Sequence, residues 1–272
     1  MKILKKISFV LLSLSILFIA APLSFASETN DQVEKEIITK KEIIDKTEQI
    51  EKFYKGDIKL QNKLKAKIKN GEELDSNNPK KASLGEVEKI DESTFKITYP
   101  DGSYALEGID LSNTKVYDEE GNLLGNFNDL YPDGTLNFNP IKGTVLPEEP
   151  QFSTMDKNTI SGGTVTVGSG YRTAKGVKVY HYSYHMTVQF KVDYTLVQSG
   201  YDYISRIYGV DIAAYEWDIL SEGVFRKKET LEYSAYGGVK FKIKEYADAT
   251  KTGTAHLYIR VAKDKAWIDI DY

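Results

Sequence analysis

Three histidines are the side chains best suited to metal or proton chemistry in this 272-residue chain, and His181 and His185 stand four residues apart. On a helix this spacing brings two imidazoles together, whereas on a strand it separates them by about 13 Å. Valines and tyrosines surround both histidines and favour a strand, so we expect no shared metal ion. His256 falls on the polar side of its own expected strand, where we expect exposure without a catalytic role.

Carboxylate pairs are the second source of chemistry, because two acids can act as the general acid and base of a hydrolase. The C-terminal part supplies five candidates: Asp193, Asp202, Asp211, Glu216 and Asp218. Any β domain of this size contains as many, so we assign no catalytic residue. The chain also lacks the motifs of a nucleophile elbow, a phosphate-binding glycine loop, a zinc-protease helix and a calcium loop. We therefore expect no cofactor and favour a non-catalytic protein over an enzyme.

Aromatic side chains give the strongest remaining signal, since 14 of the 19 tyrosines follow residue 150. An exposed tyrosine or tryptophan offers a flat apolar face with a polar tip, which suits sugar rings and protein partners. The residues that flank expected loop ends are the predicted binding residues: Tyr201, Tyr203, Tyr215 and Trp217. By contrast, Tyr180, Tyr182 and Tyr184 alternate in step with Val188 and Phe190, so packing is their expected role.

The first 26 residues predict export. Lys2, Lys5 and Lys6 precede an apolar run at 7–20, and small residues lie at Ser24 and Ala26. This is the pattern of a cleaved signal peptide, and the apolar run is shorter than the ~20 residues of a membrane-spanning helix. We therefore predict a secreted, extracellular protein without a transmembrane span after cleavage.

Composition narrows the class of protein further. The chain has no cysteine, so it carries neither disulfides nor a thiol nucleophile, and together with the lysine-rich signal this favours a Gram-positive source. Without the signal, 33 basic face 40 acidic side chains. Nucleic acid is therefore an unexpected partner, because its phosphates require a concentrated positive surface.

The elements that would position these residues change character along the chain. Residues 27–80 are charged, and apolar residues such as Leu60, Leu64 and Ile68 recur at helical spacing. We expect this segment to form a pair of helices. Its expected role is that of a spacer, a propeptide or a partner-binding helix. Residues 81–139 hold most of the acidic excess and alternate at a period of two, which predicts a small β meander.

A proline-containing segment at 140–160 is the expected linker, and residues 161–272 are the expected all-β C-terminal domain. In 239–244, Val239, Phe241 and Ile243 alternate with three lysines, as on a half-buried strand. We predict a mainly β fold: an antiparallel sandwich or partly closed barrel preceded by the meander and the helical segment.

One short pattern occurs twice. Phe95-x-x-x-Tyr99-Pro-Asp-Gly recurs as Phe127-x-x-x-Tyr131-Pro-Asp-Gly. Either a hairpin is duplicated, or a common turn sequence occurs twice because proline and glycine suit the two central turn positions.

Several short motifs resemble an uncharacterised β-rich domain of secreted Firmicute proteins, a domain of unknown function. They include Gly168-Ser-Gly-Tyr171, Gly176-Val-Lys-Val-Tyr180, Phe190-Lys-Val-Asp-Tyr194 and Gly200-Tyr-Asp-Tyr-Ile204. The resemblance implies export and a β domain, and it supplies no catalytic residues.

Together these features favour a secreted, non-catalytic protein that recognises a cell-envelope, carbohydrate or protein ligand through aromatic contacts. Two alternatives remain open. One is an extracellular hydrolase with paired carboxylates, and the other is a bacteriocin-like effector that acts on membranes through alternating strands.

Overall fold

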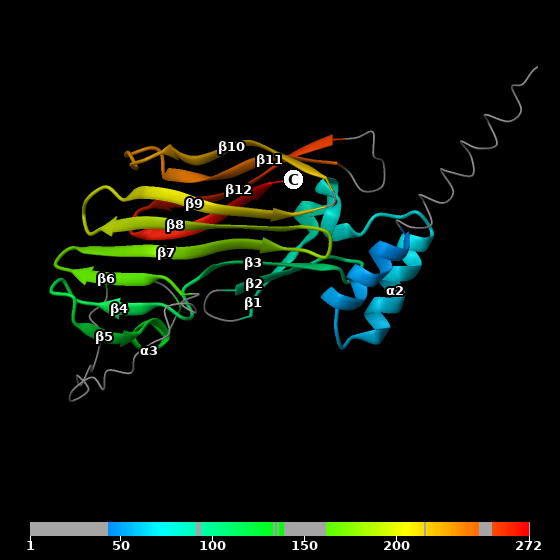
Figure 1. Ribbon diagram of the computed structural model, residues 1–272, viewed down its shortest axis with the longest axis horizontal. Coiled ribbons are helices and arrows are strands. Elements are labelled where there is room, and N and C mark those ends of the chain that lie inside the picture. Colours follow the sequence, from blue (N-terminus) through cyan, green and yellow to red (C-terminus); the bar gives the residue numbers. More distant parts are fainter. Residues whose placement is uncertain are drawn as a thin grey trace, which may run out of the picture. The chain divides into compact units, whose positions relative to one another are not determined.

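The computed structural model describes residues 43–90, 94–132, 134, 136–138, 162–214, 216–244 and 252–271 (Figure 1). The predicted signal peptide at 1–26, the predicted linker at 140–160 and Tyr215 lie outside the described residues. The described part is mainly β, with two sheets preceded by helices, which confirms the predicted fold class.

The first sheet curls into a half-barrel and contains strands from both sides of the predicted linker (Figure 1). Its strands are β1 (Glu86–Lys89), β2 (Thr94–Thr98), β3 (Tyr104–Asp110), β4 (Lys115–Tyr117), β5 (Leu123–Asn126), β6 (Thr164–Gly168), β7 (Tyr171–Tyr182), β8 (Thr187–Val197) and β9 (Tyr203–Ala213). The order is β1-β2-β3-β7-β6-β4-β5, and β8 pairs with β7 and β9. Every pair is antiparallel except β4 with β6, which is parallel.

The second sheet is a four-stranded antiparallel meander. It consists of β10 (Trp217–Arg226), β11 (Ala235–Lys244), β12 (Thr252–Ala262) and β13 (Lys265–Asp271) in that order. Val239 and Phe241 are buried as their alternation predicts, and they join one core with Phe190 and Val192 of β8. Each large apolar side chain buried between the two sheets contributes about 1.5–3 kcal/mol to folding.

A helical segment precedes the sheets. It comprises a helix over residues 43–53, α2 (Ile58–Lys69) and two 3₁₀ turns, η1 (Asp75–Asn77) and η2 (Pro79–Leu84). The Asp57 carboxylate accepts a hydrogen bond from the Leu60 N–H and caps α2. The apolar faces of the helices bury Ile50, Leu64 and Ile68, as the helical spacing predicts.

A buried polar cluster joins this segment to the turn between β2 and β3. Lys67 Nζ lies 2.6 Å from Asp75 Oδ1 and 2.8 Å from Asp101 Oδ2, and Lys81 also binds Asp75. Burial alone would raise the pKa of Asp75 and Asp101, but the hydrogen bonds from the lysines outweigh it. Both pKa values therefore lie below the ordinary value of an aspartate.

The two copies of the repeated pattern fold differently. Tyr99–Ser103 forms the turn between β2 and β3, where Gly102 adopts a φ of 85°. The second copy instead begins with a one-turn helix, α3 (Phe127–Leu130), and its Phe127 ring stacks on Tyr131 with ring centroids 4.8 Å apart. The duplicated-hairpin hypothesis is therefore wrong.

A tight turn between β7 and β8 places two tyrosines on the opposite sheet face from the one expected from the sequence. Tyr180 pairs with Gln189, whereas Val179 pairs with Phe190, so Tyr180 and Tyr182 stand on the opposite face from Phe190. The turn reverses the alternation that a continuous strand would have kept. Tyr184 lies in this turn and packs against the helices, where its hydroxyl accepts a hydrogen bond from the Asn77 amide at 2.9 Å.

Candidate functional site

The histidines do not form a metal site. The turn after β7 separates His181, which is buried in the strand 3.5 Å from a Glu107 oxygen, from His185. The expectation that both stand on one strand is therefore wrong. Burial lowers the pKa of His185 to about 3, so this ring is neutral, and its Nδ1 lies 2.9 Å from the Ser183 hydroxyl. Among the described residues, no three His, Asp or Glu side chains form a group that could hold a metal ion.

The candidate carboxylates are spread over the fold. Asp193 accepts hydrogen bonds from the Gly176 N–H at 2.7 Å and from the Arg206 guanidinium. Asp211 accepts one from the Gln189 amide, and Asp218 stands opposite Lys242 on the other sheet. Asp193 and Gln189 are four residues apart on β8, or about 13 Å. Asp211 is paired with Gln189 on the neighbouring strand, so it lies about as far from Asp193 as Gln189 does. The two carboxylates are therefore too far apart to act as an acid and base pair.

Asp202 has a structural environment of a different kind. It is fully buried, and it accepts hydrogen bonds from the N–H groups of Val197 at 2.7 Å and Asp264 at 2.8 Å. Glu229 accepts the neighbouring Lys263 N–H at 2.9 Å. Lys263 and Asp264 have φ values of 54° and 61°, which side-chain-bearing residues adopt only with strain. The two carboxylates therefore hold the strained turn between β12 and β13.

This clamp predicts a pH-dependent stability. Burial raises the pKa of Asp202 to about 6, above the ~3.9 of an unfolded aspartate. The folded chain thus binds this proton more tightly, and the resulting stabilisation is present below pH ~4 and lost as the pH rises through ~6. The free energy of unfolding should fall by up to about 1.4 kcal/mol per pH unit in this interval.

Urea unfolding at pH 4.5, 5.5 and 7 of the wild type and of Asp202→Asn tests this assignment. The variant lacks the titrating proton, so its profile should be flatter by the contribution of Asp202. Parallel profiles for the two proteins would show that Asp202 does not titrate in this interval.

The predicted binding residues do not form one cluster. Tyr203 forms an isolated β-bridge with Lys228, and the Lys228 ammonium lies 5.4 Å from the centre of the Tyr201 ring. Trp217 begins β10, at the opposite end of β9 from Tyr203, so about 33 Å of strand lies between them. The structure therefore brings Tyr201 and Tyr203 together and places Trp217 elsewhere.

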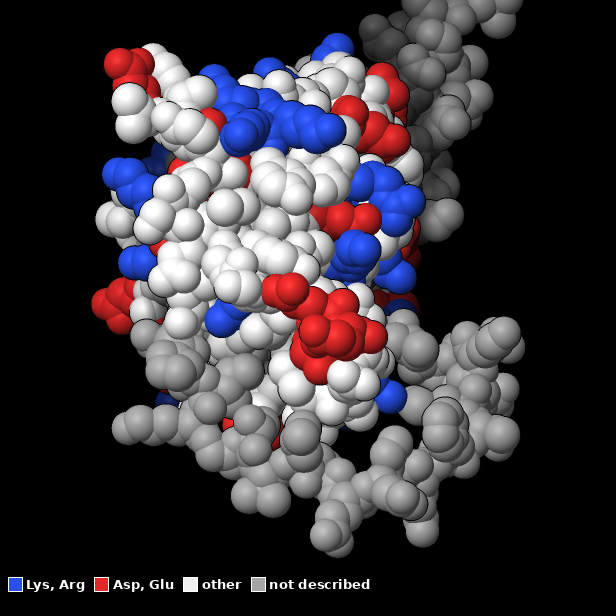
Figure 2. All heavy atoms as spheres, turned by 90° about the vertical axis from the view of Figure 1, so that its left-hand side faces the viewer, with Lys and Arg blue, Asp and Glu red and all other residues white. Residues whose placement is uncertain are grey.

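Figure 2 faces the end of the sheets at which β8 turns into β9 and β10 into β11. An uncharged area lies between basic side chains above and acidic side chains below. The connection between β10 and β11 exposes two large apolar residues at this end, Leu231 and Tyr233. Tyr201 lies in the connection between β8 and β9, and thus at the same end of the sheets as the exposed Leu231 and Tyr233.

The outer face of the second sheet carries several aromatic side chains, of which Phe225, Tyr236 and Tyr258 are in mutual contact. We call it the aromatic face, and it consists of Phe225, Tyr233, Tyr236, Tyr258 and Trp267 together with Arg226 and Arg260. Cross-strand pairing places Arg226, Tyr236, Arg260 and Trp267 in one row across four strands. Side chains at paired positions share a face, and four strands span about 14 Å.

Three rings of the aromatic face touch one another. The centroids of Phe225, Tyr236 and Tyr258 are 5.4–5.6 Å apart in each pair, and His256 stacks on Tyr258 at 4.2 Å. Trp267 is 42% exposed, Phe225 38% and Tyr233 57%. Rings that are held by strands and still reach solvent are available to a ligand.

Two arginines place positive charge beside the rings of the aromatic face. The Arg226 guanidinium lies 4.8 Å from the Tyr233 ring and 5.3 Å from the Tyr236 ring, and it donates to the Ser234 carbonyl. The Arg260 Nε is 2.5 Å from Asp269 Oδ2. These contacts hold both planar cations against rings, where a guanidinium stacks favourably and can still donate hydrogen bonds.

The sequence pattern alone does not single out the residues of the aromatic face, although part of the signal lies in β12. Tyr258 and Arg260 alternate with buried Leu257, Ile259 and Val261 and thus share the polar side of β12 with His256. What the alternation did not show is that β10, β11 and β13 add rings to the same rows. That convergence depends on the strand order and register.

Comparison of the chain with protein-family models, curated proteins and solved structures gives no match. The resemblance to secreted Firmicute domains therefore stays a prediction, and function is argued from the geometry. In the part of the chain that the structure describes, no helix has the length and apolar character to cross a bilayer.

Proposed function

We propose that this protein is an exported, non-catalytic binding module whose aromatic face holds a cell-envelope glycan. The observation that carries the proposal is the contact between the rings of Phe225, Tyr236 and Tyr258 on three paired strands, with the partly exposed Trp267 ring on the same face of the fourth. The export pattern at 1–26 supports a ligand outside the cell.

Sugar rings suit this surface for two physical reasons. Their apolar faces stack on exposed aromatic rings, which removes apolar area from water. Their hydroxyls need donors and acceptors at the edge of the stack, and Arg260 with Asp269 and Arg226 supply these next to Tyr236. The strands hold the groups in place, so a ligand loses little affinity to ordering them.

The double variant Phe225→Ala/Trp267→Ala is expected to weaken binding at least tenfold. It removes two exposed rings and leaves the inward side chains of β10 and β13 unchanged. A tenfold loss corresponds to about 1.4 kcal/mol, which is modest for two stacked rings. The measurement is sedimentation of the mature protein with purified Gram-positive cell wall and with intact cells.

Two further variants locate the contact. Leu123→Ala removes an equally exposed apolar side chain from β5, on the first sheet, and should bind like the wild type. Tyr201→Ala/Trp217→Ala tests the residues selected from the sequence. If that variant loses retention while Phe225→Ala/Trp267→Ala keeps it, the aromatic face is not the binding surface. Retention on cells without retention on purified wall would indicate a protein ligand instead.

A further inference from the structure

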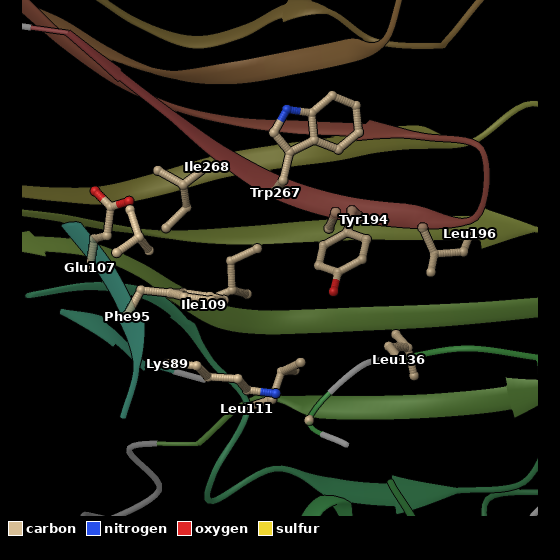
Figure 3. Close-up of a pocket in the computed structure, with 13 residues that line it drawn as sticks. Lys89, Phe95, Glu107, Ile109, Leu111, Leu136, Tyr194, Leu196, Trp267 and Ile268 are labelled. Carbon is tan, nitrogen blue, oxygen red and sulfur yellow. The ribbon is translucent and has the colours of Figure 1, made fainter. Parts of the chain in front are cut away.

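A cavity of about 320 Å³ lies between the β1–β3 strands, β8 and the edge strand β13 (Figure 3). Its walls are mostly apolar and include Ile109, Leu111, Leu136, Leu196 and Ile268. A dry apolar cavity of about 150 Å³ is large enough to bind benzene. The present cavity therefore has room for a molecule of about two fused rings, at the lower end of the size range of small-ligand sites.

One polar group from the core opens into this space. Tyr194 is only 1% exposed, and Figure 3 shows its hydroxyl directed into the cavity toward Leu111. No residue in the described ranges forms a hydrogen bond with this hydroxyl, and burial is the sole cause that raises its pKa. A hydroxyl that faces a mainly apolar cavity and has no protein acceptor can donate a hydrogen bond to a ligand held there.

The charges at the cavity argue for a neutral ligand. Lys89 of β1 and Glu107 of β3 both contribute to the lining and carry opposite charges. An anionic group attracted by Lys89 would be repelled by Glu107. A cationic group attracted by Glu107 would be repelled by Lys89. The ring of Trp267 points away from the other labelled side chains in Figure 3, and β13 also borders the cavity with Ala266 and Ile268.

We propose that this cavity binds a small, uncharged, mainly hydrocarbon molecule that carries one carbonyl oxygen, to which the Tyr194 hydroxyl donates a hydrogen bond. The apolar walls supply most of the affinity, and the hydroxyl selects the oxygen-bearing ligand over a hydrocarbon of the same shape. This site shares only Trp267 with the aromatic face: its ring lies on that face, and the residue also borders the cavity.

Two probes of matched shape test the proposal: 2-acetylnaphthalene, a ketone, and 2-ethylnaphthalene, its hydrocarbon counterpart. Dissociation constants come from titrations followed by the backbone amide resonances of Ala266 and Ile268, which line the cavity. The wild type should bind the ketone about three- to tenfold more tightly than the hydrocarbon, as one added hydrogen bond predicts.

Tyr194→Phe removes only the hydroxyl, so the variant should fold and should bind both probes with equal affinity. Ala266→Phe fills the cavity from β13 and should abolish both titrations. Equal affinities of the wild type for the two probes would overturn the proposal. So would a ketone preference that persists in Tyr194→Phe, or an absence of shifts at the lining residues at saturating probe.

Discussion

Asp101→Ala is expected to lower the free energy of unfolding by about 3–5 kcal/mol, the usual loss when one partner of a buried ion pair is removed. Asp101 Oδ2 accepts hydrogen bonds from Lys67 Nζ and from the Asp75 N–H, both at 2.8 Å. Its Oδ1 accepts the N–H and the hydroxyl of Ser103. The substitution leaves these donors without an acceptor at the junction of the helical segment and the β2–β3 turn. Urea unfolding measures the change.

Asp110→Ala is the matched control. Asp110 lies 3.2 Å from Lys178 but is more exposed, so its removal should lower the free energy of unfolding by less than about 1 kcal/mol. Equal losses for the two variants would show that burial of the Asp101 cluster contributes nothing.

The cluster also has a defined pH dependence. Because the pKa values of Asp75 and Asp101 are depressed, their stabilisation is present above the unfolded pKa of ~3.9 and lost as the pH falls through the lower folded values. The sign is opposite to that of Asp202.

Gly238→Ala is the second substitution with a large expected effect, a loss of at least about 3 kcal/mol. Gly238 on β11 has a φ of 149°, and a Cβ there would lie 2.1 Å from the Leu257 carbonyl oxygen of β12. Backbone atoms cannot give way as a flexible side chain can, so the β11–β12 pairing would have to open. A lowered midpoint of thermal and urea unfolding is the expected observation.

Gly253→Ala provides the comparison within the same strand pair. Among the described residues, a Cβ at Gly253 would meet only Ile243 Cγ1, at 3.9 Å, which is an ordinary contact. Its effect should stay within about 1 kcal/mol, and it can be stabilising because alanine restricts the unfolded chain. If Gly238→Ala were as mild as Gly253→Ala, the close approach of β11 to β12 at this point would be wrong.

Local patterns were sufficient for the element types. Leu60, Leu64 and Ile68 recur at helical spacing and lie on α2, and Val239 and Phe241 alternate and face the core of β11. These predictions succeeded because the side-chain period of a helix or strand depends only on neighbours along the chain.

Local patterns failed where the chain turns. Nothing in the run from Tyr180 to Phe190 distinguishes one long strand from a hairpin, and the turn between β7 and β8 decided the face of every residue after it. Likewise, Phe127 and Tyr131 match Phe95 and Tyr99 in pattern and adopt a helical turn, because their surroundings differ.

The candidate site shows the same limit. The sequence indicated aromatic recognition, yet the rings that come together belong to β10–β13, while Tyr203 and Trp217 stand at opposite ends of β9. The sequence gives no indication that the Tyr194 hydroxyl faces a cavity, because Tyr194 alternates with Val192 and Leu196 like an ordinary core residue.

By itself, the amino-acid order determined the absence of disulfides, the helical start, the β-rich remainder and the inward side of most strands. Only the tertiary structure decided that β3 pairs with β7 and β4 with β6, across the segment expected to be a linker. It also decided which rings share a row and which space stays unfilled. Periodicity is a property of adjacent residues, whereas strand pairing depends on the packing and closure of segments about 50–75 residues apart, and no local pattern encodes that choice.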